Sequence, residues 1–159
     1  MIDNIKNLMK PKSKINLQPT ICNLCGGQVV YTSNSRIYGS EFGSGKCYLC
    51  LDCGAYVGTH IPRPKEAFGI LSNEEMRHLK KECHDIFDKQ YLGVSNVMEM
   101  RKERKLAYKR MAVALGIPVA ECHFGYFDMD MLHKAYTYLK MIEPEITTKY
   151  IKRKQGDNK

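Results

Sequence analysis

The chain has 159 residues, 43% of them hydrophobic, and a formal net charge of +8. That hydrophobic share excludes a wholly disordered chain. No apolar run reaches the ~18 residues of a transmembrane helix, and the N-terminus lacks the apolar stretch of a signal peptide. We therefore expect a protein of the reducing cytoplasm that enters no membrane. Paired cysteines there bind metal ions more often than they form disulfides.

The first sixty residues divide into an arm and a β-rich segment. Residues 1–20 carry four lysines against one aspartate, and we expect them to form a flexible basic arm. Residues 21–60 are rich in glycine, cysteine and tyrosine, and their charges balance. Short runs typical of β-strands, separated by turn sequences, occur at 28–32, 36–38, 46–49 and 55–59.

Residues 61–146 are predicted to be helical after a connecting loop. Two prolines and a glycine within 61–70 indicate the loop. The first helix is predicted to begin at Ser72, because Glu75 three residues later completes a capping box. Leu71 and Met76 are placed to form the accompanying hydrophobic staple.

Two more helices are predicted in this region. The second begins near Ser95 or Asn96 and stops at Gly116, a residue that commonly ends helices. The third is predicted over 128–143, since Pro144 cannot supply a backbone N–H to a helix interior.

Two short cysteine motifs carry the clearest chemical signal. Cys22 and Cys25 are followed by a glycine, and Cys50 and Cys53 are followed by another. Two residues between cysteines allow both thiolates to reach one ion from a tight turn, and the glycine lets the backbone turn back. A hairpin joining two such knuckles is typical of a zinc ribbon. Four cysteine ligands leave no open coordination position, so this zinc is expected to be structural.

The other cysteine patterns are weaker signals. Redox pairs usually open a helix after a strand, whereas glycine and β-type sequence follow here. Cys47 could compete for the second pair, because Cys47 and Cys50 also have two residues between them. We prefer Cys50 with Cys53, since Gly54 completes that knuckle. Cys83 and Cys122 are expected to be buried thiols.

Several longer motifs resemble a phage and prophage family described as a zinc-finger-containing domain of unknown function. The resemblance covers roughly residues 21–140 and implies a mobile-element origin, without supplying a reaction. Besides the two knuckles, it rests on Gly54–Gly58, His60, Asn73, Arg77, His84, Phe87, Asp88, Arg104, Ala107, Tyr108, His123, Gly125, Phe127 and Asp128.

A basic helix face and a basic tail suggest a partner. At 100° per residue, four basic residues of the second helix fall on one arc: Arg101, Lys102, Lys105 and Lys109. Residues 147–159 form a tail that we expect to be frayed, with basic residues at Lys152, Arg153 and Lys154. Such groups could neutralise nucleic-acid phosphates with weak sequence preference, although a solvated helix face is the simpler interpretation.

The order of His60, Asn73 and His84 permits a nuclease hypothesis. It resembles the order in HNH nucleases, in which one histidine activates water and another holds a divalent metal. Asn73 is expected to open a helix with His84 three turns along it, a separation that is poor for joint ligation. We favour the alternative that His60 and His84 fix packing between ribbon and helix, because isolated histidines without a clear ligand set are usually structural. Convergence of His60, His84 and His123 on one cleft would strengthen the enzyme hypothesis.

Together these features predict an α+β protein: a zinc ribbon over 21–60 packed on a three-helix region over 61–146. The favoured function is a non-enzymatic zinc-binding accessory module that contacts nucleic acid. One alternative is a phage inhibitor or adaptor that binds a host protein, such as a defence nuclease or a polymerase. The other is the metal-dependent nuclease. The expected location is the cytoplasm of the host.

Overall fold

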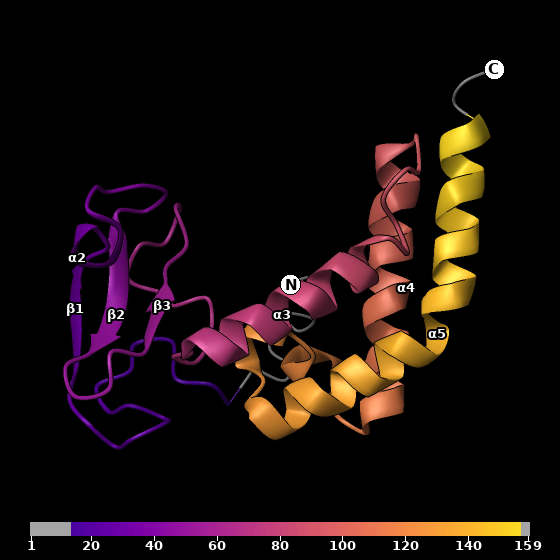
Figure 1. Ribbon diagram of the computed structural model, residues 1–159. Helices are drawn as coiled ribbons and strands as arrows, with labels where there is room; N and C mark the ends of the chain where they lie inside the picture. Colours follow the sequence, from indigo (N-terminus) through magenta and orange to yellow (C-terminus); the bar gives the residue numbers. More distant parts are fainter. Residues whose placement is uncertain (1–13, 157–159) are drawn as a thin grey trace, which may run out of the picture.

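The computed structural model describes residues 14–156, and its N-terminal part is a small antiparallel sheet. Strands β1 (Val29–Ser33), β2 (Lys46–Cys50) and β3 (Tyr56–Gly58) lie side by side in that order. Val29 pairs with Cys50 across the β1–β2 hairpin. One cysteine knuckle precedes β1 and the other connects β2 to β3. The predicted α+β fold with an N-terminal ribbon is confirmed (Figure 1).

One of the predicted β-type runs is a helical turn instead. Residues 36–38 belong to α2 (Ser35–Tyr38), which lies between β1 and β2. The buried Asn34 stabilises the helical turn. Its carbonyl accepts hydrogen bonds from the Ile37 and Tyr38 N–H groups, and its side-chain amide donates to the Phe42 carbonyl. The intrinsic β preference of isoleucine and tyrosine is overridden by this turn.

Helix α3 (Glu74–Asp88) begins one residue later than the capping-box pattern predicts. Its N-cap is Asn73, whose side-chain oxygen accepts a hydrogen bond from the Met76 N–H at 2.8 Å. Ser72 is unavailable for capping, because its backbone exchanges hydrogen bonds with Tyr56 of β3. The expected staple is also absent, since Leu71 belongs to the ribbon's buried cluster and Met76 to that of the helices.

The next two helices begin where local signals place them. Asn96 caps α4 (Val97–Leu115), and Gly116 closes it with a φ of 67°, in the left-handed region. Two 3-10 turns follow, η1 (Val119–Glu121) and η2 (Phe124–Tyr126). Helix α5 then begins at Met129, with the Asp128 carboxylate accepting from the Met131 N–H.

Helix α5 (Met129–Gly156) continues through Pro144, against the prediction. The helix changes direction part-way along, so that its C-terminal half runs beside α4 (Figure 1). A proline bends a helix because its ring clashes with the preceding turn and it offers no N–H. Tertiary contacts hold the far half: Ile146 is buried, and Arg153 donates to the carbonyls of Lys89 and Leu92. The expected frayed tail is therefore a docked helix as far as residue 156.

The ribbon and the helices have separate cores that meet at the start of α3. The helical core gathers around Phe87, Met111 and Leu139, and the smaller ribbon core contains Tyr48 and Leu71. Backbone pairing of Tyr56 with Ser72 joins β3 to the segment before α3. Gly69 lies against the Gly125 carbonyl so closely that a Cβ atom would sit 1.9 Å from its oxygen.

Of the predicted basic arm, residues 1–13 lie outside the described part of the chain, as do residues 157–159 of the tail. The end of the arm contacts the folded domain: the Leu17 carbonyl accepts from the Ala67 N–H. Among the helices described, none has the length and apolar character needed to span a membrane.

Candidate functional site

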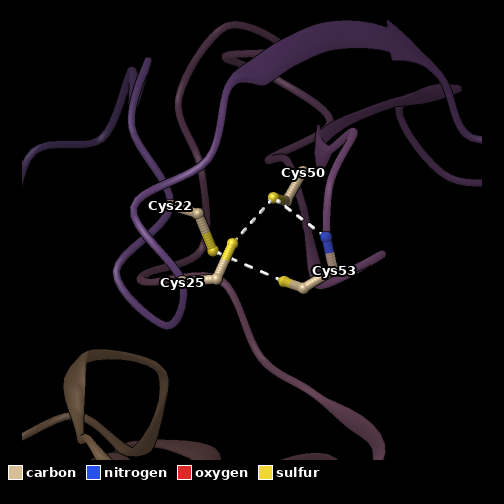
Figure 2. A group of neighbouring side chains, drawn as sticks. All are labelled: Cys22, Cys25, Cys50 and Cys53. Atoms are coloured by element: carbon tan, nitrogen blue, oxygen red, sulfur yellow. Dashed lines mark hydrogen bonds between the residues drawn. The ribbon is translucent and has the colours of Figure 1, made fainter.

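The four predicted zinc ligands converge at one end of the ribbon (Figure 2). Their sulfur atoms all lie within 4.8 Å of one another. The Cys22 sulfur is 3.7 Å from that of Cys53, and the Cys25 sulfur is 3.5 Å from that of Cys50. Cys22 and Cys50 are buried, whereas Cys25 and Cys53 are exposed. Each knuckle thus supplies one inner and one outer thiol.

Backbone amides point at the sulfurs in both knuckles. The Leu24 N–H donates to the Cys22 sulfur, the Gly27 N–H to that of Cys25, and the Cys53 N–H to that of Cys50. The turns that aim them require glycine, with φ of 75° at Gly26 and 78° at Gly54. The Cys53 amide lowers the pKa of the Cys50 thiol to about 7, because it stabilises the thiolate.

Cys47 is not part of this group. Cys47 and Cys50 lie three residues apart in one strand, so their side chains leave opposite faces of the sheet. The Cys47 sulfur lies 4.0 Å from the Ser33 carbonyl oxygen, and burial raises the pKa of this thiol. Cys83 and Cys122 are fully buried in the helical core, as expected.

The sulfur arrangement fits a tetrahedral zinc ion. Zn–S bonds of ~2.3 Å place tetrahedral sulfurs about 3.8 Å apart. The Cys22–Cys53 and Cys25–Cys50 separations of 3.7 and 3.5 Å are close to that value. A comparison with known families agrees: the model of a zinc-finger-containing domain matches residues 18–142. The chain belongs to this zinc-finger-containing family. No curated protein and no solved structure gives a significant match.

For this family member, the four-cysteine cluster is suited to one zinc ion. Thiolates are the ligands that structural zinc prefers, and four of them complete its coordination. The first knuckle, Cys22–Cys25, also positions α3. The Asn23 side chain, between the two cysteines of the first pair, both donates to the Leu71 carbonyl and accepts from the Leu71 N–H. The metal-binding turn is thereby tied to the chain just before α3.

The predicted nucleic-acid-binding residues of α4 form an exposed surface, which we call the basic face: Arg101, Lys102, Lys105 and Lys109. Within the described chain, none of the four pairs with a carboxylate at salt-bridge distance. Glu103 and Arg110 line a cavity against α5 and lie about 140° around the helix from the basic face. The basic face therefore points away from α5.

The basic residues at the end of α5 have different environments. Arg153 is partly buried and donates to two backbone carbonyls, at 2.5 Å to Lys89 and 3.2 Å to Leu92. Lys152 and Lys154 are exposed, and the Lys154 ammonium lies 5.0 Å from the Tyr150 ring centroid. The last turns of α5 thus lie beside the loop that precedes α4, with two lysines free to meet solvent.

The residues of the nuclease hypothesis do not assemble into a ligand set. The Asn73 side chain caps α3, and His60 packs edge-on against Phe68, with centroids 4.6 Å apart. His84 lies against Phe124. In the described part of the chain, the four cysteines are the one group of three or more His, Cys, Asp or Glu with closely clustered ligand atoms.

His84 and His123 do converge, on a pocket of about 580 Å³ that we call the junction pocket. It lies between the ribbon, α3 and the η2 region, and its lining also includes Arg77, Lys80 and Tyr108. Burial lowers the pKa of both imidazoles, with Arg104 adding to the effect. His60 is not among the lining residues. The sequence alone does not predict this pocket, although the spacing of Arg77, Lys80 and His84 on one helix face could have indicated its α3 wall.

Arg104 is held by aromatic rings. Its guanidinium lies 5.2 Å from the Tyr108 centroid and 5.9 Å from that of Tyr91. The Tyr91 hydroxyl donates to the Asp88 carboxylate at 2.5 Å. Arg104 and Asp88 therefore share Tyr91 as a neighbour, and the two rings give Arg104 a structural environment.

Proposed function

We propose that this chain is a non-enzymatic, zinc-stabilised module that binds nucleic acid through the basic face of α4 and the lysines ending α5. The observation that carries the proposal is the basic face itself, four exposed cations without carboxylate partners in the described chain. A surface of this kind attracts a polyanion through the release of condensed counterions. The resemblance of the sequence to phage proteins supports an accessory role in a host cytoplasm.

Zinc has a structural part in this proposal. Bound by Cys22, Cys25, Cys50 and Cys53, it would close the ribbon, and the contacts of Asn23 with Leu71 would transmit that order to α3. The helices would then present the basic face. Because backbone phosphates carry no sequence information, binding is expected to be weakly specific.

The test is the salt dependence of binding to a labelled oligonucleotide, measured by fluorescence anisotropy. Each neutralised phosphate contributes roughly 0.7–0.9 to the slope of log K against log salt. The double variant Lys102→Gln/Lys105→Gln should therefore weaken binding at low salt and reduce the slope by about 1.4–1.8. A matched control removes the same charge elsewhere, in Lys65→Gln/Lys134→Gln, where both lysines are also exposed.

Equal binding by the two double variants would refute the proposed surface. Binding that does not change between low and moderate salt would contradict a phosphate-based interaction. The absence of nucleic-acid binding even at low salt would instead favour the alternative partner, a host protein.

A further inference from the structure

The junction pocket lies where the ribbon meets the helices. In Figure 1 the N-terminal end of α3 approaches β3, and this is where the pocket is found. Its volume of about 580 Å³ falls within the range of small-molecule sites in proteins. The ribbon contributes one wall, α3 the second, and residues 123–125 the third.

The cations that line this pocket are Lys46, Arg77 and Lys80, and within residues 14–156 no aspartate or glutamate lines it. His84 and His123 also line it, as imidazoles whose pKa burial lowers. Arg77, Lys80 and His84 fall on an arc of about 60° around α3, so one helix face points them together. A pocket lined with basic groups and lacking carboxylates favours an anionic ligand.

The two strongest bases are held in place by the protein. The Arg77 guanidinium donates to the Ser72 carbonyl at 2.6 Å and lies 4.1 Å from the Tyr56 ring centroid. The Lys80 ammonium donates to the Ser72 hydroxyl at 2.5 Å. Burial and the nearby Arg77 lower the pKa of Lys80 to about 8. An anion bound here would relieve the repulsion between the two cations.

Aromatic side chains from three parts of the chain also line the pocket. Tyr38, Phe42 and Tyr56 come from the ribbon, Phe68 from the following loop and Phe124 from η2. Phe42 is 59% exposed and Phe68 is 50% exposed, so a flat ligand in the pocket could cover both rings. Aromatic side chains stack on nucleobases at about 1–3 kcal/mol per base. Phosphate alone would leave these rings uncovered.

We propose that the junction pocket binds a nucleotide, with the phosphate at Arg77 and Lys80 and the base against the aromatic side chains. The nucleotide is either free or the 5′-phosphorylated end of a strand, because both present the same chemistry. This site is separate from the basic face of α4 and does not depend on it, since Arg77 and Lys80 belong to α3.

The test is calorimetric titration of the zinc-loaded full chain with AMP, GMP, CMP and UMP, each compared with inorganic phosphate and with adenosine. At least one nucleotide should bind at least tenfold more tightly than phosphate or the nucleoside. Lys80→Met should weaken that binding at least tenfold. Lys81→Met is the matched control, because Lys81 is adjacent, 75% exposed and paired with Asp85 on the surface.

Two further measurements complete the experiment. Amide chemical shifts recorded during titration of the unmutated chain should change at Ser72, Lys80 and Phe124, which tests the location independently of any variant. Competition by a 5′-phosphorylated oligonucleotide, but not by its 5′-hydroxyl form, would identify a strand end; competition by neither would identify a free nucleotide.

Three results would overturn the proposal. One is the absence of binding by all four nucleotides at millimolar concentration. Another is equal affinity for nucleotide and inorganic phosphate, which would indicate a simple anion site. The third is equal affinity of the Lys80→Met and Lys81→Met variants.

Discussion

At the residue scale, Lys80 is a cation whose charged form is destabilised by the fold. It is partly buried beside Arg77, and its pKa is lowered from 10.5 to about 8. The unfolded chain therefore binds more protons than the folded chain between pH 8 and 10.5, so this group adds stability as pH rises through that window. Below pH 8 the full cost of burying the charge is present.

Lys80→Met is accordingly expected to stabilise the protein at pH 7. The pKa shift corresponds to about 3 kcal/mol, from which loss of the hydrogen bond to Ser72 subtracts roughly 1 kcal/mol. Denaturant unfolding should show a gain of about 2 kcal/mol at pH 7 that shrinks toward pH 10.5. A constant difference at every pH, or a gain of the same size in Lys81→Met, would contradict this account.

The choice between Cys47 and Cys53 as the partner of Cys50 could have been made from the sequence. Both cysteine pairs that include Cys50 satisfy the spacing of a zinc knuckle. Strand alternation decides between them, because residues three apart in a strand face opposite sides of the sheet. The competing position could thus have been excluded from a strand that reaches Cys50, as β2 does, one residue beyond the predicted run 46–49.

At the element scale, the end of α5 depends on contacts distant in sequence. Pro144 is a valid stop signal, and the helix continues because Ile146 and Arg153 find partners against α4 and the α3–α4 loop. Ser72 similarly satisfies a capping pattern that its pairing with β3 prevents. Local signals predicted the starts of α4 and α5, where the Asn96 and Asp128 side chains accept from backbone N–H groups of the first turn. They missed the positions where tertiary contacts intervene.

Arg153→Ala should release the last turns of α5. Its two hydrogen bonds to backbone carbonyls are expected to contribute about 1–2 kcal/mol, which lowers the melting temperature by roughly 3–6 °C in a chain of this size. Lys152→Ala is the control, because Lys152 is exposed and should change stability by less than about 0.5 kcal/mol. Melting curves that coincide for the two variants would show that Arg153 does not hold the helix.

At the scale of the whole molecule, two cores of unequal size share one junction. The ribbon core is small and includes two of the zinc ligands, so metal binding is expected to supply part of its folding free energy. The Asn23 and Ser72 contacts join it to α3. The junction pocket draws most of its residues from the ribbon, α3 and η2, and only those of α3 share a local pattern. The zinc site could therefore be predicted from local motifs, whereas the whole pocket could not.

The central claim is a single zinc ion held by Cys22, Cys25, Cys50 and Cys53. X-ray absorption spectroscopy at the zinc edge tests it directly on the purified chain. We expect one zinc per chain surrounded by four sulfur atoms at about 2.3 Å. A coordination shell containing nitrogen or oxygen, or fewer than four sulfurs, would contradict it.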